Sequence, residues 1–128
     1  MVGRTVEVAS ENGHQWFFEL EGRRVCISIE CPWRLLHKGK IRLTSEDHNQ
    51  KYGLPAPIDA VAEANKLLNG SRIVGAEIRH GTSDLLVSFE GELKLEAIPV
   101  FSGYEAWQLY TPQGRQIIAG CAGELSIC

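Results

Sequence analysis

The chain has 128 residues, which fits one domain, and its 44% hydrophobic and 23% charged residues exclude a disordered protein. Its 13 lysines and arginines against 16 aspartates and glutamates give a formal charge of −3, so the chain as a whole is not attracted to nucleic acid or to an anionic membrane. The 13 glycines favour many tight turns over long helices. We therefore expect a single β-rich domain over residues 1–128.

The first part of the chain is predicted to consist of strands. Apolar and polar side chains alternate there, and Asn12-Gly13 is a dipeptide favoured in tight hairpin turns. A three-stranded meander is expected, with strands at residues 5–9, 14–20 and 23–30. Two shorter strands, at residues 33–37 and 40–44, are expected on either side of Lys38-Gly39.

A loop and a helix follow these strands. Residues 44–57 are polar and rich in turn formers, so they predict the longest loop. Beyond it, apolar residues recur with helical spacing, Pro57 suits a first turn and Gly70 suits a C-terminal cap. We expect one amphipathic helix over residues 57–69 that covers a sheet. Its apolar stripe comprises Ala60, Val61, Ala64, Leu67 and Leu68.

From Ser71 onward the pattern is again that of strands, and it predicts an antiparallel meander of about five strands. In the hairpin at residues 104–119, Trp107 and Leu109 share one face and Pro112-Gln113-Gly114 forms the turn. The other strands are predicted at residues 72–79, 83–89, 92–98 and 124–127. The predicted fold class is α+β and mostly antiparallel β, with two meanders forming a sandwich or half-barrel and one amphipathic helix.

No motif for catalysis or metal binding is present in the sequence. There is no Gly-x-Ser-x-Gly elbow, and the later glycines fall between predicted strands, which does not favour a phosphate-binding loop. The cysteines and histidines match no usual zinc spacing; they are Cys26, Cys31, Cys121, Cys128, His14, His37, His48 and His80. We expect no catalytic residue, no cofactor and no metal site.

The start of the chain, Met-Val-Gly-Arg-Thr-Val-Glu, lacks the apolar run of a signal peptide, and no window approaches the length of a membrane-spanning helix. The predicted location is therefore the cytoplasm, with no membrane partner. A reducing compartment keeps cysteines as thiols, so we expect no disulfide.

A basic cluster of Arg34, His37, Lys38, Lys40 and Arg42 lies beside Trp33. Cations around a stacking aromatic are the composition of a nucleic-acid site. Strands, however, send alternate residues to opposite faces, and the charge of the whole chain is negative. We expect a solvated strand edge here and no nucleic-acid partner.

Carboxylates gather on the later strands: Asp84, Glu90, Glu92 and Glu96 surround a single Lys94. Outward strand positions are usually polar, so a solvated face is one interpretation. The other is a recognition surface for a basic partner, whose association the carboxylates steer. Tyr104 would add an aromatic anchor to that surface, and Glu105 a further charge.

Several of these residues carry a resemblance to a known family. They are Pro32-Trp33-Arg34, Gly81-Thr82-Ser83-Asp84-Leu85, Phe89, Tyr104-Glu105-Ala106-Trp107-Gln108-Leu109 and Pro112-Gln113-Gly114. The arrangement resembles a bacterial family of small β-rich proteins that look like immunity proteins of polymorphic toxin systems, including contact-dependent growth inhibition. The resemblance covers roughly residues 28–127, and its most specific part is Tyr-Glu-x-Trp with the Pro-x-Gly turn.

The resemblance implies a cytoplasmic protein, not an enzyme, that binds and neutralises a cognate toxin domain, often a nuclease. A mildly acidic inhibitor suits a basic nuclease, which agrees with the acidic strands. Trp107 and Gly114 are expected to be structural. A different interpretation remains open: a ligand-binding module or enzyme with a pocket between sheet and helix, lined by His80, Asp84 and Tyr104.

Overall fold

The computed structural model describes residues 6–12, 15–20, 25–100, 105–111, 114–119 and 125–127. Its elements are, in order, β1 (Val6–Asn12), β2 (Gln15–Leu20), β3 (Val25–Ile29), β4 (Trp33–His37), β5 (Lys40–Thr44), the 3-10 helix η1 (Ser45–Asp47), α1 (Ala60–Leu68), β6 (Ile73–Ile78), β7 (Leu85–Phe89), β8 (Leu93–Ala97), β9 (Trp107–Thr111), β10 (Gly114–Ala119) and β11 (Leu125–Ile127). The predicted strands are therefore confirmed within a few residues of their expected ends.

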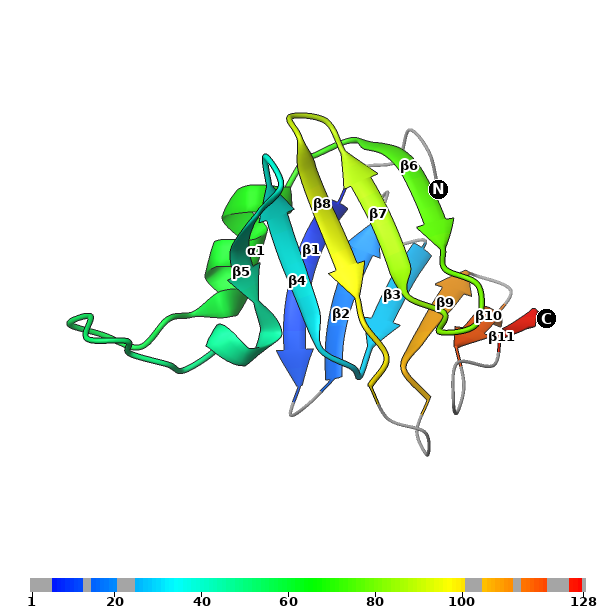
Figure 1. Ribbon diagram of the computed structural model, residues 1–128, viewed down its shortest axis with the longest axis horizontal. Coiled ribbons are helices and arrows are strands. Elements are labelled where there is room, and N and C mark those ends of the chain that lie inside the picture. Colours follow the sequence, from blue (N-terminus) through cyan, green and yellow to red (C-terminus); the bar gives the residue numbers. More distant parts are fainter. Residues whose placement is uncertain are drawn as a thin grey trace.

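The described strands form two antiparallel sheets that stack as a sandwich (Figure 1). The six-stranded sheet has the order β1-β2-β3-β9-β10-β11, and the five-stranded sheet has the order β5-β4-β8-β7-β6. With α1 as its single described α-helix, the molecule has the predicted α+β fold.

The prediction that the later strands form one five-stranded meander is wrong. After β8 the chain leaves the five-stranded sheet, and β9 pairs with β3, where Ile27 lies opposite Leu109. The strand β8 instead pairs with β4, where Leu35 lies opposite Leu95. Alternation along a strand identifies its buried face, but it is the same whichever strand lies next to it, so the pattern could not predict the partner.

The hydrophobic core fills the space between the two sheets. At its centre Trp33 of β4 meets two rings of β2 edge to face: the ring centroids lie 4.9 Å apart for Trp16 and 5.6 Å apart for Phe18. Each sheet contributes buried side chains to it, among them Ile27, Ile29 and Trp107 from one and Leu35, Leu85, Val87, Phe89, Leu93 and Leu95 from the other. The aromatic contacts join the sheets directly.

The helix α1 closes one side of the sandwich. Its N-cap Asp59 accepts a hydrogen bond from the Ala62 N–H at 3.1 Å, which is why the helix begins after Asp59 and not at Pro57. It contacts β1 and β5, the edge strands of the two sheets, so it lies against the open edge and does not cover a sheet face as predicted (Figure 1). The small buried residues Ala60 and Ala64 allow this close approach. No helix in the described ranges is long and apolar enough to cross a membrane.

A buried cysteine yields a pH-dependent prediction. Cys31 precedes β4 as a free, buried thiol, and burial raises its pKa from 9.0 to about 12. Above pH 9 the unfolded chain releases this proton and the folded protein keeps it, so stability present below pH 9 is lost as the pH rises towards 12.

We expect the free energy of unfolding to fall by about 1.4 kcal/mol between pH 8 and pH 10 because of Cys31. Urea denaturation of the wild type and of Cys31→Ala at both pH values isolates this contribution, since all other titrating groups are shared. Equal losses in the two proteins would contradict the prediction.

Candidate partner-binding surface

Of the six residues predicted to bind a partner, the five that the structure describes lie at different places on the two sheets. Glu90 and Glu92 lie at the turn that joins β7 to β8. Asp84 and Glu96 lie at the opposite ends of the same two strands, where Leu85 pairs with Ala97. Glu105 precedes β9 in the other sheet, and Tyr104 lies outside the described residues. The five described residues of the predicted surface therefore lie at separate places on the two sheets, and their binding role stays a prediction.

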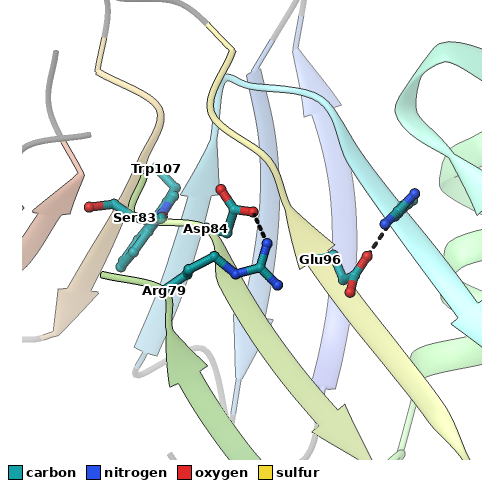
Figure 2. Close-up of polar contacts among 6 residues, drawn as sticks. Arg79, Ser83, Asp84, Glu96 and Trp107 are labelled. Carbon is teal, nitrogen blue, oxygen red and sulfur yellow. Dashed lines mark hydrogen bonds and ion pairs between the residues drawn. The ribbon is translucent and has the colours of Figure 1, made fainter. Parts of the chain in front are cut away.

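Asp84 shapes the turn between β6 and β7. Its carboxylate accepts a hydrogen bond from Arg79 Nη1 at 3.1 Å, and its backbone carbonyl accepts one from the Arg79 N–H at 2.9 Å. The Ser83 N–H in turn donates to the Arg79 carbonyl at 2.9 Å. Figure 2 shows Arg79 reaching back to Asp84, with Ser83 beside it. Because Asp84 is buried and paired with a cation, it adds little negative charge to the surface.

Trp107, the most specific residue of the family resemblance, is part of the scaffold. It is buried in the six-stranded sheet, and its indole N–H donates to the carbonyl of Ser83 at 2.7 Å (Figure 2). Ser83 itself is buried with a φ of 60°, in the left-handed region. One hydrogen bond therefore links β9 to the β6–β7 turn of the opposite sheet, in agreement with the expected structural role.

Glu96 is also paired. It lies directly opposite Arg34 on the outer face of the five-stranded sheet, and its carboxylate accepts a hydrogen bond from Arg34 Nε at 2.5 Å. This cross-strand pair removes one acid from the predicted acidic surface and one cation from the predicted basic cluster.

The turn between β7 and β8 holds the two predicted acids that remain. Glu90 and Glu92 are both exposed, and neither carboxylate joins an ion pair with another described residue. Their backbone is fixed, because the Glu90 N–H donates to the Arg72 carbonyl and the Lys38 N–H donates to the Glu92 carbonyl, both at 3.0 Å. The carboxylates are thus presented to solvent from a well-defined turn.

Glu105 belongs to a row of polar side chains along β9. The side-chain amide of Gln108 donates to the Glu105 carboxylate, and the Tyr110 hydroxyl donates to the Gln108 amide oxygen. Gln108 is buried, so this row is part of the packing of β9 as well as of its surface. Glu105 is exposed, but its carboxylate is hydrogen-bonded to Gln108.

The basic cluster lacks the aromatic residue that would make it a nucleic-acid site. Trp33 is only 1% exposed and lies in the core, so no base can stack on it. Arg34 pairs with Glu96, and Arg42 lies 3.7 Å from the Glu63 carboxylate. His37, Lys38 and Lys40, which are exposed around a turn, are the members of the cluster that form no ion pair with another described residue.

Two of the three residues named for a pocket between sheet and helix lie away from the helix, and the third, Tyr104, is outside the described residues. His80 and Asp84 flank the turn before β7, whereas α1 contacts β5 and β1. Two strands, β4 and β8, separate β5 from β7, so these side chains are about 14 Å from the helix side of the sheet. Among the described residues, no group of three or more His, Cys, Asp and Glu side chains could hold a metal ion.

Sequence reasoning missed two exposed features. The outer face of the five-stranded sheet carries the apolar residues Leu36, Leu86 and Ile41, of which Ile41 is 61% exposed; the alternation placed Leu86 on an outward face but did not predict that the three gather there. The long loop carries Tyr52 and Leu54, both more than half exposed. Two apolar residues in an otherwise polar loop were the signal available for the second feature.

No protein-family model, no curated protein and no solved structure matches the chain. The relation to toxin-immunity proteins therefore stays a prediction from the resemblance, and the geometry described above is the basis for any proposal about function.

Proposed function

We propose that this protein is an immunity protein, which binds a cognate toxin domain and neutralises it by occluding the active site or the path of the substrate. The observation that supports this most directly is the turn bearing Glu90 and Glu92. Two exposed carboxylates on a fixed backbone suit a basic partner. The backbone of the turn does not have to be ordered on binding, and neither carboxylate has to be freed from an ion pair with a described cation. A nuclease, whose active site is made to hold phosphate, is such a partner.

Two further observations favour binding over chemistry. Asp84 and Glu96 each form an ion pair with an arginine, so their carboxylates stabilise the fold and are not free to act as catalytic acids or bases. The outer face of the five-stranded sheet faces the viewer in Figure 1 with no described helix across it, and Leu36 and Leu86 on it are half-buried by their neighbours. This side of the sandwich is therefore accessible to a partner protein.

The test is complex formation with the C-terminal domain of a large secreted protein encoded immediately upstream. We expect the two chains, expressed together in the cytoplasm, to copurify and to elute as one species in size-exclusion chromatography. Growth should stop when the toxin domain is expressed alone and should continue when both chains are present. Separate elution together with unrelieved growth arrest would refute the proposed function.

The acidic turn makes a kinetic prediction. Reversing both charges, in Glu90→Lys/Glu92→Lys, is expected to lower the association rate about tenfold at low ionic strength, with a smaller effect at 0.5 M salt, because exposed charges act mainly on the encounter. Surface plasmon resonance at several salt concentrations measures this. Glu30→Lys/Glu77→Lys, which reverses two exposed acids outside the turn, is the matched control. An equal effect of the control would assign the result to net charge and not to the turn.

A further inference from the structure

A finger formed by residues 49–58 projects from the edge of the sandwich, between η1 and α1 (Figure 1). Two hydrogen bonds of 2.8 Å close its neck: the Asn49 N–H donates to the Ile58 carbonyl, and the Ile58 N–H donates to the Gln50 carbonyl. At its tip the Leu54 N–H donates to the Lys51 carbonyl at 2.7 Å. The finger therefore has a defined shape although it leaves the body of the molecule.

The base of the finger is tied to the core. Asp47 of η1 accepts hydrogen bonds from the Tyr52 hydroxyl and from the Thr44 N–H, both at 2.9 Å. His48 accepts one from the Ala60 N–H at 3.1 Å, and its ring lies edge-on to Trp16, with 5.4 Å between the ring centroids. These contacts fix the base of the finger to the start of α1 and to the aromatic core.

The tip carries apolar side-chain surface that the fold leaves exposed. Tyr52 is 65% exposed and Leu54 is 52% exposed, and Pro55 and Pro57 follow them. Tyr52 also has a φ of 45°, the left-handed region that a bulky residue adopts only at a cost. An ordered, strained tip that leaves its apolar side chains exposed buries none of that surface in the fold, but its order lowers the entropic cost of binding another molecule.

The charges at the base indicate the chemistry of that molecule. Between residues 44 and 59 there are three acids, Glu46, Asp47 and Asp59, and one base, Lys51. Glu63 is not counted with them, because Arg42 and Lys66 lie 3.7 and 3.5 Å from its carboxylate. The base of the finger therefore has an excess of two negative charges. An apolar tip above an acidic base fits an apolar cleft with a basic rim, and it is repelled by an anionic membrane.

From these observations we infer that the finger inserts into a cleft of a partner protein, lined by apolar side chains and rimmed by basic ones, with Tyr52 and Leu54 as the anchors. A projecting element requires a concave partner, and tyrosine is among the residues that contribute most to binding when buried at an interface. This inference rests on the proposed function, because the partner meant here is the toxin domain. The finger supplies the occluding element that the acidic turn, a shallow feature, does not.

The test compares two double variants that remove exposed apolar side chains. We expect Tyr52→Ala/Leu54→Ala to weaken binding of the refolded toxin domain about 100-fold, mainly through faster dissociation. Val74→Ala/Val100→Ala is the control, because these side chains are 49% and 59% exposed and belong neither to the finger nor to the apolar row of Leu36, Ile41 and Leu86. The control is expected to bind like the wild type. Surface plasmon resonance gives both rates, and circular dichroism verifies that each variant is folded.

Hydrogen exchange tests the inference on the unaltered chain. In the complex, the amides of residues 49–58 should exchange at least tenfold more slowly than in the free protein, in which the finger is exposed. Binding of the wild type with unchanged finger exchange and unchanged dissociation of the Tyr52→Ala/Leu54→Ala variant would overturn the inference and leave the proposed function intact. Absence of any complex with the wild type would refute both.

A vesicle assay distinguishes a protein cleft from a membrane. Vesicles of phosphatidylserine and phosphatidylcholine should bind neither the wild type nor the Tyr52→Ala/Leu54→Ala variant. Vesicle binding by the wild type that this variant loses would show that the finger binds a membrane and would overturn the inference of a protein cleft.

Discussion

Replacing Trp33 with alanine should destabilise the protein by about 3–5 kcal/mol, much of the 5–15 kcal/mol that holds a typical domain together. Trp33 is 1% exposed, and it is the residue of the five-stranded sheet that meets both Trp16 and Phe18 of the other sheet. Its removal opens a cavity at the junction and deletes two edge-to-face contacts, each worth about 0.5–1.5 kcal/mol beyond the buried area.

Urea denaturation followed by fluorescence measures this loss, and Val74→Ala is the control. Val74 lies on β6 with half its surface exposed, so its truncation should change stability by no more than about 0.5 kcal/mol. A Trp33→Ala protein within 1 kcal/mol of the wild type would mean that the two sheets are not held together at this residue.

The second large effect is expected for Trp107→Phe, at about 2–4 kcal/mol. This change removes part of a buried ring and also the indole N–H that donates to the Ser83 carbonyl at 2.7 Å. The hydrogen bond connects β9 to the buried turn before β7, so its loss should loosen the contact between the sheets at that end.

Trp33→Phe is the matched control for this variant. It removes the same part of an indole ring from the core, but Trp33 Nε1 has no hydrogen-bond partner among the described residues. The difference between the two Trp→Phe variants in the free energy of unfolding therefore reports the hydrogen bond, at about 1–3 kcal/mol. Equal losses would show that the indole N–H of Trp107 contributes nothing to stability.

Local patterns in the sequence predicted the elements well. The strands around Lys38-Gly39 have the expected bounds, since the glycine turn fixes where one strand ends and the other begins. The pairing of strands was not predictable in this way. Nothing in the alternation of residues 107–111 distinguishes β3 from β8 as a neighbour, because the choice depends on how two complete sheets pack.

The candidate site was predicted less well, for a related reason. Arg34 and Glu96 are far apart in sequence but directly opposed across β4 and β8, so a count of acids along the chain overestimates the free negative charge. The finger was predicted as a loop without further structure. Its order comes from Asp47 and from backbone hydrogen bonds at its neck, which composition does not reveal.

The division of the later strands between two sheets has a consequence for the growing chain on the ribosome. Every strand of the five-stranded sheet lies between β3 and β9 in the sequence, so that sheet can pair its strands while β9 is still being made. Until then, the edge of β3 that will receive β9 has unpaired N–H and C=O groups, and such an edge is a template for pairing with other chains. The interval between synthesis of β3 and of β9 is therefore when the protein is most exposed to aggregation.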